Sequence, residues 1–147
     1  MTESPSLADA IRAACLRFQG VERLYLAEAI DARRMRNARS AMCIPAQETV
    51  ILLYDDSLLE NNKVGLAVCA GGLYWKNDWS VGSRRTRLSW GEFAQRKRIR
   101  EKDLSVDLAR GDRIGLAVLG EAERAQVIAL LGEIQAVCKK EFEAGRG

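Results

Sequence analysis

The apolar pattern in the middle of the chain predicts a three-stranded antiparallel meander. Three short runs are rich in β-branched and aromatic residues, and polar or glycine-containing turns separate them. The runs are residues 49–54, 64–69 and 73–76. Gly71 and Gly72 lie between the last two runs, where a tight hairpin needs a residue with positive φ. We expect this meander to be the structural centre of the protein.

Two adjacent carboxylates, Asp55 and Asp56, end the first of these runs and precede Ser57. Such a pair has the chemistry of an acid–base site or of ligands for a hard cation. Adjacent residues at a strand end point in different directions, however, and a calcium loop needs further oxygens at regular intervals that this stretch lacks. We therefore expect these side chains to form the turn and to cap the backbone.

Apolar residues at helical spacing lie on both sides of the meander. A first helix is predicted within residues 1–20, with Ser6 as its N-cap and Gly20 as its end. A short strand and a second helix, capped by Asp31, are predicted within residues 21–47. The second helix carries four arginines off its apolar stripe, and we expect them to face solvent. These are Arg33, Arg34, Arg36 and Arg39.

Antiparallel strands are predicted throughout residues 48–119. After the meander, alternating apolar and polar residues indicate four more strands, the last two joined by a hairpin turn. These strands are residues 84–90, 95–100, 103–108 and 113–119. Residues 121–142 then carry a continuous apolar stripe at helical spacing, which predicts a long C-terminal helix.

This order of elements predicts a single α+β domain over residues 1–147. About seven strands would form an antiparallel half-barrel, which the long C-terminal helix caps and an N-terminal helical extension precedes. A chain of 147 residues is long enough to bury a real core and too short for two comfortable domains.

A signature in the central strands resembles that of a bacterial family of pleckstrin-homology (PH) type, found in poorly characterised proteins. Its parts are an apolar strand ending in Asp-Asp-Ser/Thr, a Lys-x-Gly strand, and a Gly-apolar-Tyr-aromatic-Lys-Asn strand. The matching residues are Asp55, Asp56, Ser57, Lys63, Gly65, Gly72, Tyr74, Trp75, Lys76 and Asn77. The resemblance implies a half-open barrel closed by one helix and used for binding, without catalytic residues. The loop after Ser57 departs from the family pattern, because it is richer in apolar residues and poorer in Gly and Ser.

Composition indicates a soluble protein. The chain is 48% hydrophobic and 29% charged, and none of its stretches approaches the roughly 18 uninterrupted apolar residues of a membrane span. The first residues include Glu3 and Asp9 and lack the basic start and apolar core of a signal peptide. We therefore expect a cytoplasmic protein.

The cysteines and the absence of histidine argue against metal and nucleophile chemistry. Cys15, Cys43, Cys69 and Cys138 are far apart in the sequence, and the chain contains no histidine. This excludes the usual zinc patterns and every Ser-His or Cys-His nucleophile pair. We expect reduced thiols, no bound metal, no cofactor and no enzymatic activity.

Basic residues crowd the later strands, and an aromatic side chain lies close to them in the sequence. Trp79 lies in a predicted loop and is the best candidate for an exposed aromatic contact. Two interpretations of the basic residues are open. They either only keep the strand faces soluble, or they form a patch that attracts anions. The predicted partner-binding residues are Trp79, Arg84, Arg85, Arg87, Arg96 and Arg98.

The leading functional hypothesis is a non-enzymatic module that binds an acidic protein partner through this face. A bacterial immunity protein that blocks a toxin would be a special case. The alternative is a binder of anionic surfaces, either phospholipid headgroups or nucleic acid.

Overall fold

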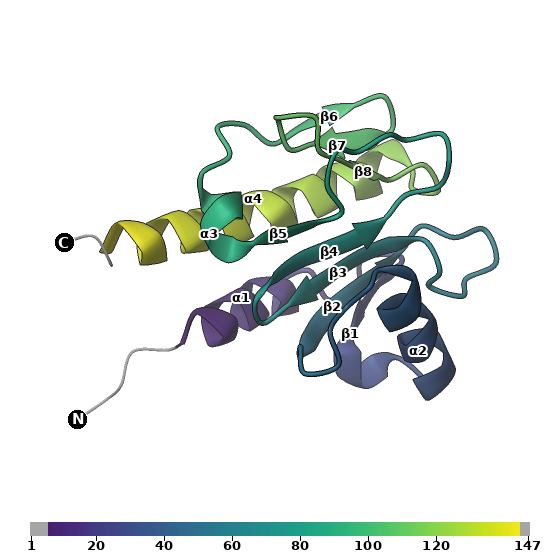
Figure 1. The fold of residues 1–147 in the computed structure, drawn as a ribbon. Helices are drawn as coiled ribbons and strands as arrows, with labels where there is room; N and C mark the ends of the chain where they lie inside the picture. The colour runs from purple at the N-terminus through teal and green to yellow at the C-terminus, as the bar shows by residue number, and fades with distance from the viewer. Residues whose placement is uncertain (1–5, 145–147) are drawn as a thin grey trace.

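Residues 6–144 are described by the computed structural model, and they form an α+β protein with two antiparallel sheets and a long C-terminal helix (Figure 1). The helices are α1 (Leu7–Leu16), α2 (Ala32–Ala41), α3 (Trp90–Ala94) and α4 (Glu121–Ala144), with a 3-10 turn η1 (Ala27–Ala29). The first sheet contains, in spatial order, β1 (Leu24–Leu26), β2 (Val50–Asp55), β3 (Gly65–Cys69), β4 (Gly72–Lys76) and β5 (Arg87–Ser89). The second contains β6 (Arg100–Lys102), β7 (Ser105–Asp107) and β8 (Arg113–Gly115). Within residues 6–144 the sheets do not close into a barrel.

The predicted central meander is confirmed. Strands β2, β3 and β4 pair antiparallel in sequence order. The expected role of the hairpin glycines is wrong, since neither Gly71 nor Gly72 has a positive φ. Gly72 is needed for a different reason: a Cβ atom there would lie 2.2 Å from the main-chain oxygen of Leu88. The glycine therefore permits the close approach of β4 and β5.

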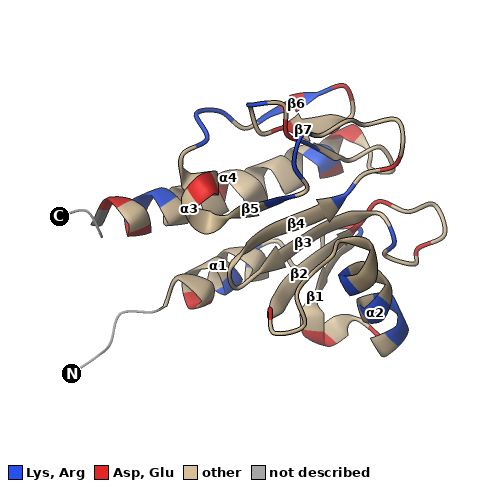
Figure 2. Cartoon of the chain, viewed as in Figure 1, with Lys and Arg blue, Asp and Glu red and all other residues tan. Residues whose placement is uncertain are grey.

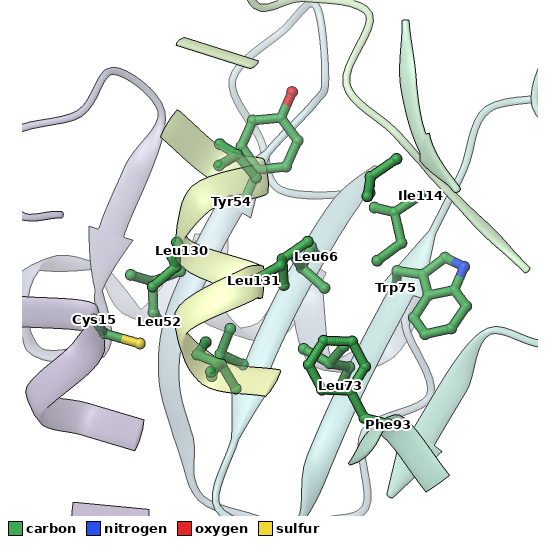
Figure 3. Packing of buried hydrophobic residues seen from close by; sticks show 14 of the residues in the cluster. Cys15, Leu52, Tyr54, Leu66, Leu73, Trp75, Phe93, Ile114, Leu130 and Leu131 are labelled. Carbon is green, nitrogen blue, oxygen red and sulfur yellow. The ribbon is translucent and has the colours of Figure 1, made fainter. Parts of the chain in front are cut away.

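Helices cover both faces of the five-stranded sheet (Figure 1). Helices α1 and α4 pack on one face in the larger core, which includes Ile11 of α1. Figure 3 shows Cys15 of α1 in this core with Leu130 and Leu131 of α4. Helix α2 packs on the other face in a smaller core that includes Ala38. Because side chains alternate along a strand, β2 contributes to both cores.

The C-terminal helix carries the predicted buried stripe. Val127, Leu131, Ile134 and Cys138 are fully buried, whereas Phe142 at the end of the stripe is 39% exposed. Helix α1 also contacts α4 outside the core, through an ion pair of 3.0 Å between Arg17 and Glu133. No helix within the described residues has an apolar stretch long enough to cross a membrane.

The N-caps of α1 and α2 follow the sequence, whereas the end of α1 and three strand predictions do not. Helix α1 ends at Leu16 and not at Gly20, and the strand predicted over residues 113–119 ends at Gly115. Ser6 caps α1 and Asp31 caps α2, each accepting a hydrogen bond from a main-chain N–H of the first turn. The predicted strand over residues 95–100 is wrong, because most of this segment is the connection between α3 and β6. The strand over residues 84–90 is shorter than predicted, because Ser89 caps α3 and Trp90 begins it.

Two of the four arginines on α2 do not face solvent as expected. Arg34 pairs with Asp55 at 3.1 Å and stacks on the ring of Tyr25. Arg39 donates hydrogen bonds to the main-chain oxygens of Pro45 and Glu48, at 3.2 and 2.8 Å. These side chains fasten α2 to the sheet and to the loop that follows it.

The Asp55-Asp56 pair is buried and holds the end of β2. Asp55 forms the expected turn by accepting the main-chain N–H of Ser57 at 3.0 Å. Asp56 instead accepts hydrogen bonds from the Tyr54 hydroxyl and from the main-chain N–H of Val118, which lies far along the chain. Both carboxylates are thus structural groups with fixed partners.

Candidate partner-binding surface

A groove of about 520 Å³ opens between the C-terminal end of α2 and the start of the edge strand β5. We call it the basic groove, and its lining residues are Met42, Cys43, Arg85, Thr86, Arg87 and Glu92. Figure 2 shows basic residues at the start of β5 and at the end of β4. Cys43 is the one exposed cysteine of the chain.

The sheet register explains why arginines line this groove. Arg87 lies opposite Tyr74 in the β4–β5 pair, and Tyr74 packs against the smaller core next to α2. Paired residues of adjacent strands lie on the same face, so Arg87 shares the face that α2 partly covers. Arg85 lies two residues earlier and completes the basic lining.

The two groove arginines differ in their electrostatic partners. Arg85 forms an ion pair with Glu92, and both side chains are about half exposed, at 48% and 47%. Glu92 also accepts the main-chain N–H of Ser89 at 2.9 Å, and this bond, followed by the Arg85 contact, holds the pKa of the Glu92 carboxyl below its usual range. Among residues 6–144, Arg87 is exposed and has no carboxylate at ion-pair distance. Arg87 is therefore the groove cation whose charge is available to a ligand.

The prediction that Arg96 lies on an exposed basic face is wrong. Its side chain is 3% exposed and pairs at 2.8 Å with Asp112, which is 1% exposed. A second oxygen of the same carboxylate accepts the main-chain N–H of Arg85 at 2.7 Å. A guanidinium can be buried here because a carboxylate and the main-chain oxygen of Ala109 bind it. Arg96 thus supports the groove through Asp112 and does not line it.

The remaining predicted residues lie outside the basic groove. Arg84 and Arg98 are exposed, as expected. The Arg84 side chain lies over the β7–β8 turn, where a Cβ atom at Gly111 would be 3.5 Å from it. Trp79 is 98% exposed, which confirms its predicted exposure, but it lines a separate hollow at the tips of two loops. The structure therefore brings together only Arg85 and Arg87 of the predicted set.

Sequence reasoning missed Asp112 and Cys43 as parts of this surface. Asp112 lies in a segment with strong turn chemistry, so the pattern gave no sign that its carboxylate faces inward. Cys43 follows α2 with a positive φ of 55°, which turns the chain away from the helix. Pro45, two residues after Cys43, predicted that the helix ends here. Nothing in this stretch of sequence predicted that Cys43 would line a groove.

Within the described part of the chain, no group of three His, Cys, Asp or Glu side chains is placed to hold a metal ion. Comparisons with protein-family models, curated proteins and solved structures found no match for this chain.

Proposed function

We propose that the protein is a non-enzymatic interaction module of PH-like type, and that its basic groove binds an acidic segment of a partner protein. The observation that carries the proposal is the exposed guanidinium of Arg87, which lacks a carboxylate partner among the described residues and lies beside the half-exposed Arg85–Glu92 pair. Arginine binds carboxylates through two parallel hydrogen bonds, which makes it the best side chain for this recognition.

The order of elements supports the PH-like part of the proposal. Four consecutive antiparallel strands, β2 to β5, precede a three-stranded sheet and one long helix that packs against both. An antiparallel sheet followed by one long helix is the order implied by the resemblance, with α1 as the N-terminal helical extension.

The form of the groove favours a peptide over a small metabolite. Its lining comes from two separate segments, the residues that follow α2 and the start of β5, so a ligand that contacts both must span the groove. An acidic segment could place its carboxylates on Arg87 and Arg85 while its apolar atoms contact Cys43 and Thr86. An incoming carboxylate would replace Glu92 as the partner of Arg85, and this exchange costs little because the pair is half exposed.

The proposal is tested with a set of anionic probes and two matched variants. Wild-type protein is titrated with a fluorescent Glu-rich peptide, an oligonucleotide of the same charge, and vesicles that contain anionic phospholipid. The double variant Arg85→Glu/Arg87→Glu should lose peptide binding with an unchanged thermal midpoint, because exposed charges contribute little to stability. The control variant Arg84→Glu/Arg98→Glu makes the same change of net charge outside the groove and should keep most of the affinity.

Salt separates the acidic peptide from the other anions. Binding to nucleic acid or to an anionic bilayer falls steeply as ionic strength rises, because counterion release and screening dominate. Peptide binding that persists at physiological salt and needs both groove arginines supports the protein partner. Equal loss in the two double variants, or tighter binding to the oligonucleotide or the vesicles, would refute the proposed acidic protein partner.

A further inference from the structure

Three large apolar side chains protrude from two neighbouring loops. Leu58 and Leu59, in the β2–β3 loop, are 87% and 83% exposed, and Trp79, in the β4–β5 loop, is 98% exposed. Among residues 6–144, the other large apolar residues with exposed side chains reach at most 48%. Both loops leave the sheet at the end opposite to the start of α1 and the end of α4 (Figure 1). We call the three residues the apolar tip.

The apolar tip surrounds a hollow of about 390 Å³. Its lining also includes Val64 and the edges of the buried residues Asp56 and Ser57. A cavity of about 150 Å³ is large enough to bind benzene, so this hollow is large enough for an indole ring. One surface therefore carries both a protruding indole and a hollow that fits one.

The loop that presents the leucines is held in place by hydrogen bonds. The main-chain N–H of Asn61 donates to the Ser57 hydroxyl at 3.0 Å, and Asn37 of α2 donates to the main-chain oxygen of Asn61 at 2.9 Å. Arg34 of α2 donates to the side chain of Asn62 at 2.8 Å. A surface that is ordered in advance loses little conformational entropy when it binds.

The rim of the hollow carries one available charge of each sign. Lys63 lines it from the β2–β3 loop and Asp78 from the β4–β5 loop, and both are exposed. Within residues 6–144 neither forms an ion pair, whereas the nearby Glu60 pairs with Arg23 at 3.5 Å. Asp56 also lines the hollow, but its carboxylate is buried and bonded to Tyr54 and Val118. The exposed rim is therefore neutral overall and gives a strongly charged partner, such as an anionic bilayer or a nucleic acid, little net attraction.

A two-fold interface requires a surface that is complementary to itself. The apolar tip meets this requirement in shape, through the indole and the hollow, and in charge, through Lys63 and Asp78. We propose that the apolar tip is a self-association surface, in which Trp79 of each copy enters the hollow of the other and Lys63 of each copy pairs with Asp78 of the other. This surface shares no lining residue with the basic groove, so the inference does not depend on the proposed function.

The size of the surface predicts a weak, reversible dimer. A fully exposed tryptophan and two leucines present on the order of 500 Å² on each copy. Stable interfaces bury about 800 Å² on each partner, so this pair lies at the low end of the range. Most of the affinity should depend on Trp79, as expected for an aromatic anchor in a pocket.

Sedimentation equilibrium over a wide range of protein concentration tests the proposal. The wild type should shift from monomer to dimer, and Trp79→Ala should raise the dissociation constant about 30-fold. Leu104→Ala removes an exposed leucine from the β6–β7 turn and should leave the dissociation constant unchanged. Trp75 and Trp90 are buried, so a concentration-dependent blue shift of the tryptophan emission would report the burial of Trp79. A wild type that stays monomeric at every concentration would overturn the proposal.

Charge reversal tests the arrangement of the two copies. Lys63→Asp places two carboxylates at each contact and Asp78→Lys places two ammonium groups there, so each variant alone should be monomeric. A mixture of the two variants restores both pairs and should form a heterodimer. Failure of the mixture to associate, with both variants folded by circular dichroism, would refute the proposed pairing, as would a wild-type dimer that Trp79→Ala does not weaken.

Discussion

The carboxylate of Asp112 accepts the main-chain N–H of Arg85 at 2.7 Å, and through this bond a buried ion pair is connected to the basic groove. Arg96 pairs with the same carboxylate and also donates to the main-chain oxygens of Leu108 and Ala109. These contacts join the connection after α3 to the β7–β8 turn and to the segment that enters β5. The groove therefore has a buried support although its two arginines are exposed.

Asp112→Ala should lower the free energy of unfolding by about 3–5 kcal/mol, because it leaves the guanidinium of Arg96 buried without a counter-charge. Urea denaturation measures this loss. Glu101→Ala is the matched control: it removes a carboxylate that is 42% exposed and pairs with Arg124, and it should cost under about 1 kcal/mol. A urea midpoint of Asp112→Ala equal to that of the control would show that the buried pair contributes nothing.

Asp56 should give stability a measurable pH dependence. Burial, with a smaller contribution from the charge of Asp78, raises the pKa of its carboxyl above the usual value of 3.8, although the Tyr54 and Val118 hydrogen bonds oppose the shift. The folded protein therefore holds this proton to a higher pH than the unfolded chain does. The contribution of this carboxyl to the free energy of unfolding is fully present below its pKa in the unfolded chain. It is lost as the pH rises through its pKa in the folded protein.

Asp56→Asn isolates that contribution, because the amide oxygen can still accept from Tyr54 and Val118 without carrying a charge. The variant should be more stable than the wild type at pH 7, and the difference should shrink as pH falls towards the unfolded pKa. Urea midpoints measured at several pH values test this. The exposed Asp78→Asn, which removes the neighbouring charge, should reproduce only a small part of the gain. A variant that is less stable than the wild type at every pH would show that the charged hydrogen bonds outweigh the cost of burial.

The four thiols should divide into one reactive group and three protected ones. Burial raises the pKa of Cys15, Cys69 and Cys138 to about 12, whereas Cys43 is exposed. Since the thiolate is the nucleophile, a disulfide reagent should titrate one thiol in the native protein and all four in denaturant. Cys43→Ser should remove the fast reaction completely. A second fast thiol in that variant would mean that the core opens locally.

The sequence was sufficient for the elements with a clear apolar pattern. The apolar stripe of α4 repeats at helical spacing because one face of the helix is buried. The runs that became β2 and β3 are continuously apolar and end at turn residues, because both faces of these strands are covered. The sequence was not sufficient for Arg96, which belongs to a run of basic residues. Arg96 is buried because it pairs with Asp112, a carboxylate in a later turn of the chain. Periodicity cannot reveal such a partner.

The exposed loops show a signal that was present but ambiguous. Leu58 and Leu59 interrupt a polar loop, and apolar residues at such a position are either folded back onto a core or presented to a partner. The hydrogen bonds from α2 to Asn61 and Asn62 fix the course of the loop, and on this course both leucines are exposed. They join segments that are distant in the chain and lie beyond any local pattern.

The packing of α1 on α4 has a consequence for biosynthesis. The ribosome makes α1 well before α4, yet Ile11, Ala14 and Cys15 are fully buried only in the core that α4 completes. Until α4 emerges, the apolar face of the nascent meander and that of α1 lack their main cover. Such a chain exposes surface that favours misfolding or aggregation. Slow translation of the segment between the meander and α4 would therefore lengthen its dependence on chaperones.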